Sequence, residues 1–169
     1  MIIVSSLKQS AEAFAEYRPS HVISILEGDE AVPPAFDTLP ADDHLRLIEN
    51  CSEAANCNNG PGDTRCARLI ELAQRWKRGA PILIHCHQGI ARSMAAAYII
   101  MCAVEPDRSE TEIAERLRQA APHADPNLLL IAEADALLGR EDRMVEAILD
   151  LAPSSGTVAA PIVALQVAA

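Results

Sequence analysis

The sequence contains few aromatic residues and few basic ones. Two Phe, two Tyr and one Trp make up the aromatics, so the hydrophobic core has to be built mainly from Leu, Ile, Val and Ala. The 14 Lys and Arg are outnumbered by 24 Asp and Glu, which gives a formal net charge of -10. This excess argues against a broad nucleic-acid surface and against binding to anionic membranes. It still allows a small anion site made by backbone amides and one arginine.

Long apolar runs and a disulfide framework are also missing. The longest apolar runs fall well short of the roughly 20 residues that a membrane-spanning helix needs. The first residues, MIIVSSLKQSAEAF, place no basic segment before an apolar one, so they do not look like a secretory signal. The five cysteines are odd in number and irregularly spaced, which fits a reducing compartment. We therefore expect a cytoplasmic protein, with neither a membrane nor a nucleic acid as partner.

Half of the residues are apolar, and their spacing predicts alternating strands and helices. Strands are expected at Met1–Val4, His21–Leu26, His44–Glu49 and Gly79–Cys86. Helices are expected at Leu7–Tyr17, Thr64–Arg75 and Arg92–Ala103, after Ser109, and over Asn127–Ala152 with Gly139 as a candidate break. This order predicts an α/β fold, in which a mostly parallel sheet of about four to five strands is flanked by helices. We expect one domain over residues 1–152 and an Ala/Val/Pro-rich C-terminal tail, 153–169, whose role is open.

The stretch HCHQGIARS, His85–Ser93, connects the last predicted strand to a helix. In such a tight turn several backbone N–H groups can converge, and the helix N-terminus adds partial positive charge. Gly89 permits a backbone conformation that a Cβ would resist, and Arg92 offers a planar pair of donors to a tetrahedral dianion. The same positive field stabilises the thiolate of Cys86. A phosphate held here is aligned for attack by the sulfur, which forms a phosphocysteine.

These residues match the signature His-Cys-x-x-Gly-x-x-Arg-Ser/Thr. The chain resembles the cysteine-dependent protein tyrosine phosphatases, especially the compact dual-specificity-like branch with its small bacterial members. The motif directly covers Pro81–Ala103, where the Cys-x5-Arg loop lies between a strand and a helix. A looser similarity extends over Met1–Leu151, with the pair Pro126–Asn127 and the segment Gly139–Met144 as its further marks.

The resemblance implies a role for each signature residue. Cys86 is the nucleophile, Arg92 clamps the phosphate, and the Ser93 hydroxyl donates to the departing sulfur. His85 points away from Cys86 and is expected to hold the loop backbone. The phosphate-binding loop is completed by His87, Gln88, Gly89, Ile90 and Ala91. His87 and Gln88 are variable positions that either face the substrate or lie on the surface. The implied mechanism needs neither a metal nor a cofactor.

The family also uses an aspartate as general acid, on a loop that follows a strand resembling HLRL. In this chain the expected position falls at residues 50–53, where no aspartate occurs and Cys51 occupies the slot. In one reading Glu53 is the acid, since its carboxyl group has a similar ordinary pKa and a longer reach. In a second, the acid comes from a mobile loop that carries Asp42, Asp43 or Asp63. In a third, the acid is absent, which leaves a slow enzyme or a pseudophosphatase.

The expected activity is therefore hydrolysis of a phosphorylated protein or a small phosphomonoester. The alternative is a pseudophosphatase that binds phosphorylated ligands, and a less favoured one is a rhodanese-type sulfurtransferase, which also uses a cysteine in an anion-binding loop. Arginine followed by serine at the end of the loop favours phosphate. His85, Cys86 and His87 alternate across the strand, so they do not form a metal site. A reversible disulfide between Cys51 and Cys86 is a further hypothesis. The sequence predicts no oligomeric state.

Overall fold

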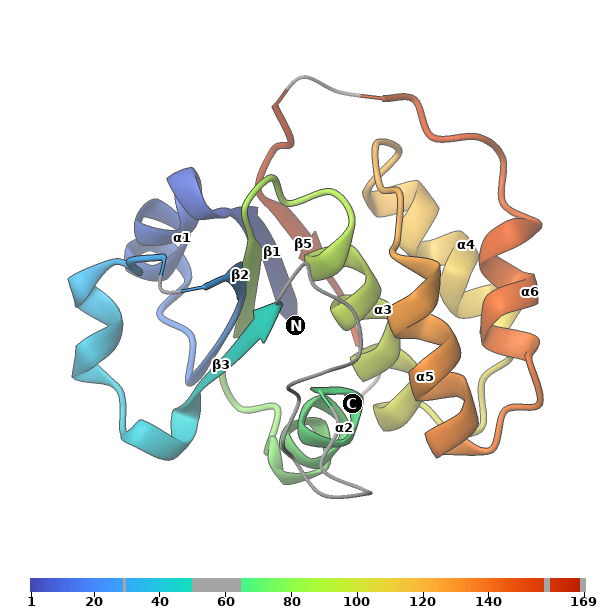
Figure 1. Cartoon of the computed structure of the whole chain (residues 1–169), viewed down its shortest axis with the longest axis horizontal. Coiled ribbons are helices and arrows are strands. Elements are labelled where there is room, and N and C mark those ends of the chain that lie inside the picture. Colours follow the sequence, from blue (N-terminus) through green and yellow to red (C-terminus); the bar gives the residue numbers. More distant parts are fainter. Residues whose placement is uncertain (29, 50–64, 157–158, 168–169) are drawn as a thin grey trace.

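The computed structural model of the chain describes residues 1–28, 30–49, 65–156 and 159–167. Within these residues five strands form one sheet in the order β3-β2-β4-β1-β5 (Figure 1). Their bounds are Ile2–Ser6 (β1), His21–Glu27 (β2), His44–Glu49 (β3), Ile82–Cys86 (β4) and Val163–Leu165 (β5). The first four strands run parallel, and β5 runs antiparallel to β1. The predicted α/β fold with a mostly parallel sheet is confirmed.

Helices cover both faces of this sheet (Figure 1). One face carries α1, and the opposite face, which covers the larger core, carries the five other helices of the described residues. Their bounds are Ser10–Tyr17 (α1), Arg65–Arg75 (α2), Arg92–Val104 (α3), Glu110–Ala120 (α4), Leu128–Leu138 (α5) and Arg143–Leu149 (α6). Short 3-10 turns span Leu7–Gln9, Pro34–Thr38 and Ala41–Asp43. None of the helices within the described ranges is long and apolar enough to cross a membrane.

The strands read as continuous apolar runs because both of their faces are buried. Along β1, Ile2 and Val4 belong to the large core under α2–α6, whereas Ile3 belongs to the smaller core under α1. All five residues of β4 are buried. Since β4 lies between β1 and β2, the residue that ends it is held at the centre of the sheet. Cys86 is that residue.

The predicted break at Gly139 is present, and it divides the expected long helix into α5 and α6. Gly139 takes the left-handed conformation, with φ of 64°. The buried carboxylate of Asp135 then accepts hydrogen bonds from the backbone N–H groups of Asp142 and Met144, both at 2.8 Å. These N–H groups lie at the N-terminus of α6 and have no partner within that helix, so a side chain of α5 stabilises the turn between the two helices.

The described part of the segment 153–169 packs against the rest of the chain. Its strand β5 pairs Leu165 with Ile2, and the Ser155 N–H donates to the Pro122 carbonyl at 2.9 Å. Along β5 the buried Val163 and Leu165 flank an exposed residue, as expected for an edge strand with one covered face. This segment therefore supplies the fifth strand of the sheet.

Candidate active site

The loop His85–Ser93 lies at the carboxyl edge of the sheet. In the register, Cys86 of β4 is level with Ser6 of β1 and Ile25 of β2. The helix α3 begins at Arg92, so the loop joins a central strand directly to a helix N-terminus. Ligands in open α/β sheets bind at this edge, where strands end and helices begin. The fold therefore places the predicted phosphate loop where an anion is best stabilised.

The sulfur of Cys86 lies at the bottom of this loop, and the residue is 2% exposed. The Gly89 N–H donates to Sγ at 3.2 Å, and the buried Ser93 hydroxyl lies 3.1 Å from the same atom. The N–H and the hydroxyl can both donate to a negatively charged sulfur, and the N-terminus of α3 adds partial positive charge. The structure thus brings Cys86, Gly89 and Ser93 together around one atom.

Gly89 is required at its position for two reasons. Its φ is 75°, a left-handed conformation that side chains with a Cβ rarely adopt. A Cβ there would also lie 2.8 Å from the Ser6 nitrogen and 2.9 Å from the Ser5 carbonyl carbon. The loop can therefore pack directly against the backbone at the end of β1 only because this residue is glycine.

Neighbouring segments hold the loop through its carbonyl oxygens. The oxygens of His87, Ile90 and Ala91 accept backbone hydrogen bonds from outside the loop. The donors are the N–H groups of Leu7 (3.4 Å), Asp125 (3.1 Å) and Asn127 (3.3 Å). None of these three residues is among those that line the cavity above Cys86. The carbonyl groups therefore form hydrogen bonds outside the cavity. Inside the cavity their negative ends would repel a phosphate.

A cavity of about 340 Å³ opens above the sulfur. It is lined by Glu27, Glu30, Cys86, His87, Gln88, Ala91 and Arg92. Arg92 Nη2 lies 3.3 Å from the Glu27 carboxylate, and His87 Nδ1 lies 3.2 Å from the Glu30 carboxylate. The two positions that the sequence left open, His87 and Gln88, therefore both face the cavity. The two glutamates come from the end of β2 and the loop after it.

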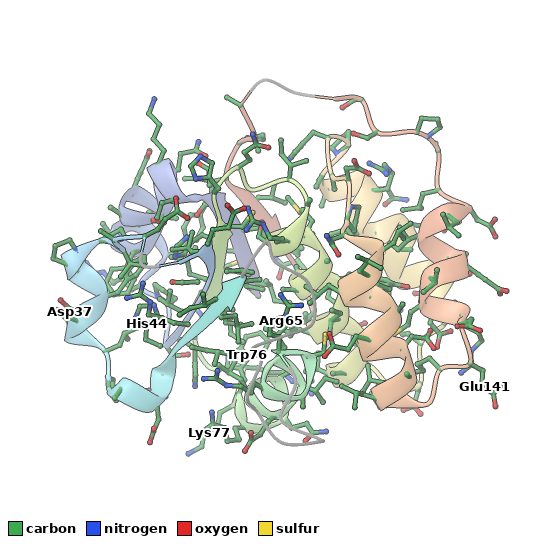
Figure 2. The ribbon with its side chains drawn as sticks, in the orientation of Figure 1. Asp37, His44, Arg65, Trp76, Lys77 and Glu141 are labelled. Carbon is green, nitrogen blue, oxygen red and sulfur yellow. The ribbon has the colours of Figure 1, made fainter. Side chains whose placement is uncertain are left out.

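His85 has a different partner from the one predicted. Its ring is fully buried, and Nε2 lies 2.7 Å from the Ser24 hydroxyl of β2, which in turn lies 2.9 Å from His44 Nε2 of β3 (His44 is labelled in Figure 2). The expected contact with the loop backbone is wrong for the described residues, among which His85 Nδ1 has no hydrogen-bond partner. Strand alternation explains this, because Ser24 is level with His85 in the sheet.

Burial keeps this histidine neutral. It lowers the pKa of His85 to about 3, and the positive charges of His44 and Arg46 act in the same direction. The hydroxyl of Ser24 can donate to one of its two imidazole neighbours and accept from the other. The ring therefore ties β4 to β2 and β3 directly behind Cys86, and it carries no charge near neutral pH.

The predicted general acids do not meet the loop within the described residues. Glu53 and Asp63 lie outside those residues. Asp43 is paired with His21 Nε2 at 3.3 Å, and Asp42 precedes it in the same turn before β3. That turn lies at the amino edge of the parallel sheet, opposite to the loop that follows β4. The carboxylates that do line the cavity, Glu27 and Glu30, were missed by sequence reasoning.

A signal for Glu27 was present in the sequence. Glu27 ends a predicted strand, and the carboxyl ends of parallel strands share one edge of a sheet, so this residue could have been assigned to the site. Glu30 lies in a Pro- and Asp-rich loop without a pattern of its own. Its approach to His87, 57 residues later in the chain, depends on the order of the strands.

Two other described cysteines are unsuited to nucleophilic chemistry. Burial raises the pKa of Cys66 and that of Cys102 to about 12, so both remain protonated thiols near neutral pH. Cys86 is the described cysteine that reaches the cavity. The hypothesis of a disulfide between Cys51 and Cys86 concerns a residue outside the described ranges. Across those ranges no three His, Cys, Asp or Glu side chains are grouped so that they could hold a metal ion.

Comparisons with known proteins place this geometry in a known fold. No family model matches the sequence, and no curated protein matches it. The structure is similar to that of DUSP15, with a TM-score of 0.57, 15% identity, and coverage of 91% of this chain and 94% of that one. It is also similar to that of human DUSP28, with a TM-score of 0.55, 18% identity, and coverage of 83% of this chain and 94% of that one. A third similar structure is the Yvh1 phosphatase domain from Chaetomium thermophilum, with a TM-score of 0.54, 18% identity, and coverage of 85% of this chain and 93% of that one.

The sequence identities are too low to transfer an activity, but the coverage is nearly complete on both sides. The resemblance carried by the motif HCHQGIARS is thereby confirmed at the level of the fold. The chain has the fold of the cysteine-dependent tyrosine and dual-specificity phosphatases.

Proposed function

We propose that this chain is a phosphomonoester hydrolase of the tyrosine and dual-specificity phosphatase type, acting through a phosphocysteine at Cys86. One observation carries the proposal. The sulfur of Cys86 receives the Gly89 N–H at 3.2 Å and lies 3.1 Å from the Ser93 hydroxyl, at the bottom of a cavity that Arg92 lines. A thiol that served only to fill the core would need none of these donors.

In the first step the phosphate dianion binds above the sulfur. The loop amides and the Arg92 guanidinium donate to its oxygens, and Glu27 gives up its ion pair with Arg92. The thiolate then attacks phosphorus in line with the leaving oxygen, so that the S–P bond forms as the P–O bond breaks. The fixed donors stabilise the charge of the transferring phosphoryl group, which is the main source of rate enhancement in this chemistry.

In the second step water attacks the phosphocysteine. The P–O bond to water forms while the S–P bond breaks, and the electron pair returns to the sulfur of Cys86. The Ser93 hydroxyl and the Gly89 N–H stabilise the thiolate that leaves. Inorganic phosphate then dissociates, and the loop returns to its starting state. No metal and no cofactor takes part in either step.

The charges at the cavity mouth restrict the substrate class. Glu27 and Glu30 add two carboxylates beside the loop, and Gln88 and Ala91 bring no positive charge. Extra anionic groups next to the scissile phosphate would be repelled, which disfavours polyphosphorylated headgroups. The proposed substrate is therefore a phosphorylated protein or a small phosphomonoester. The proposed location is the cytoplasm, and neither a membrane nor a nucleic acid is proposed as partner.

A second candidate function is a pseudophosphatase that binds phosphorylated ligands without releasing phosphate. It is favoured by the aspartate missing from residues 50–53, the position the family uses for its general acid. Loss of such an acid typically slows turnover by about 10²–10⁴-fold. The loop geometry would still bind phosphate in such a protein, so binding and turnover have to be measured separately.

The test is hydrolysis of 4-nitrophenyl phosphate from pH 5 to 8 in EDTA. We expect metal-independent turnover that Cys86→Ser abolishes, while Cys102→Ser, a change at a buried thiol outside the cavity, keeps it. Acid quenching during turnover should trap a phosphoenzyme, with more of it in Ser93→Ala. Binding of vanadate without turnover would instead support the pseudophosphatase. Transfer of sulfur from thiosulfate to cyanide would support the sulfurtransferase.

A further inference from the structure

The side chains of His87 and Glu30 are in hydrogen-bond contact at the mouth of the Cys86 cavity. His87 directly follows the nucleophile in the chain, and its Nδ1 lies 3.2 Å from Glu30 Oε1. Both residues line the cavity. The His87 side chain is 61% exposed, so it can exchange protons with solvent. Histidine is the side chain suited to such exchange between about pH 5 and 8.

We propose that His87, oriented by Glu30, is the proton donor to the leaving oxygen and the base that activates water. The inference rests on the proposed phosphatase activity. It assigns a catalytic acid to a chain that has no aspartate at residues 50–53, where the family carries one. His87 is then a catalytic residue, because it touches the reacting oxygen. Glu30 is a positioning residue, because it acts through the imidazole.

The contact with Glu30 determines which ring nitrogen of His87 transfers the proton. A hydrogen bond from Nδ1–H to the Glu30 carboxylate fixes the tautomer and leaves Nε2 as the nitrogen that gains and loses the proton. Glu30 is itself held at two points. Its Oε2 accepts from the Glu27 N–H at 3.3 Å, and its backbone carbonyl accepts from Arg46 Nη2 at 2.9 Å. These two contacts position Glu30, and Glu30 in turn orients the imidazole of the exposed His87.

Several negative charges surround His87 when substrate is bound. The Glu30 carboxylate faces Nδ1, and a bound phosphate dianion adds negative charge on the cavity side. Arg92 opposes this, but it is paired with Glu27 in the free site and with the phosphate in the complex. The Cys86 thiolate beneath the loop adds further negative charge. A ring that carries the donated proton is therefore complementary to the charges of the site.

The proton and electron movements balance over the two steps. As Cys86 attacks, the P–O bond breaks, its electron pair stays on the leaving oxygen, and that oxygen takes the proton from Nε2. In the second step the neutral Nε2 takes a proton from water as the new P–O bond forms. The S–P bond breaks and its electron pair returns to Cys86. His87 ends the cycle protonated, as it began.

The experiment compares two leaving groups in the same variants. Phenyl phosphate leaves as a phenolate whose conjugate acid has a pKa near 10, so it needs a proton, whereas 4-nitrophenolate is a far weaker base and leaves without one. His87→Ala should reduce kcat/KM for phenyl phosphate by about 10²–10⁴-fold and that for 4-nitrophenyl phosphate by a much smaller factor. Added imidazole should restore part of the lost activity.

Two further readouts separate proton transfer from a structural effect. The descending basic limb of the phenyl phosphate profile should disappear in His87→Ala. In Glu30→Gln it should move to lower pH, because the carboxylate that stabilises the imidazolium is gone. The matched controls are His21→Ala and Asp43→Asn, which break another histidine–carboxylate pair (3.3 Å) at the opposite edge of the sheet. Both should leave the two activities and the basic limb as in the parent protein.

The outcomes distinguish the inference from the function on which it rests. If His87→Ala lowers kcat/KM for both substrates by the same factor, or for neither, while turnover still depends on Cys86, then the role of His87 as proton donor is refuted and the phosphatase activity stands. If 4-nitrophenyl phosphate shows no Cys86-dependent turnover in the parent protein, the proposed function fails, and the inference fails with it.

Discussion

Acidification should destabilise this protein through His85. In the folded state burial lowers the pKa of His85 to about 3, whereas an unfolded chain has the ordinary value near 6.5. Between these two values the unfolded state binds a proton that the folded state does not. Stability from this residue is therefore fully present above about pH 6.5 and is lost as the pH falls toward 3. The slope is about 1.4 kcal/mol per pH unit in that window.

From pH 7 to pH 5 the expected loss in the free energy of unfolding is about 2 kcal/mol from His85 alone. Urea unfolding at several pH values measures it, with the fluorescence of the buried Trp76, which is the one Trp in the chain, as the probe. In His85→Gln the decline over the same range should be about 2 kcal/mol smaller. The decline that remains includes His44, whose pKa burial also lowers.

The control is His87→Gln, which removes an exposed histidine from the same loop. Its unfolding free energy should decline at least as steeply as that of the parent protein when the pH falls from 7 to 5. If His85→Gln and the parent protein lose stability in parallel between pH 7 and 5, then His85 is not a neutral, buried histidine and the reasoning is wrong.

Three further results are expected. Gly89→Ala should lower the free energy of unfolding by about 1–3 kcal/mol and abolish turnover, because its Cβ clashes with the backbone of β1 and its φ is left-handed. Gly139→Ala, where a Cβ meets nothing within 4 Å, should lower the free energy of unfolding by only about 1 kcal/mol. Asp135→Ala should cost about 3 kcal/mol in urea unfolding by removing the acceptor of two backbone N–H groups; a loss below 1 kcal/mol would contradict this. In native protein at pH 7, peptide mapping after iodoacetamide should find Cys86 alkylated and Cys102 intact, because burial raises the pKa of Cys102 to about 12; the reverse pattern would contradict the assignment.

The parts of the fold that follow local patterns were predictable. The strand His44–Glu49 and the start of α3 at Arg92 lie where the sequence placed them, and the Ser109 hydroxyl caps α4 by accepting from the Glu112 N–H. Apolar spacing and capping residues act within a few positions of each other, so one sequence shows them. Strand β5 was missed, because three residues carry no periodicity and their burial depends on pairing with β1.

The candidate site divides in the same way. Its loop from Cys86 to Arg92 is one short motif, and the spacing alone indicates that a sulfur and a guanidinium share a turn. Glu27 and Glu30 reach the cavity because β2 lies beside β4, which is a property of the strand order and not of any local pattern. The partner of His85 could not be predicted for the same reason, since Ser24 belongs to another strand.

The pairing of β1 with β5 has a consequence for how the chain is synthesised. Leu165, which pairs with Ile2, is synthesised about 160 residues after it. At about 5–20 residues per second, the nascent chain carries β1 with one edge unpaired for on the order of ten seconds. An exposed edge of apolar residues can pair with other chains. Slowed translation of residues 153–165, which contain β5, should therefore lower the yield of folded protein more than slowed translation elsewhere.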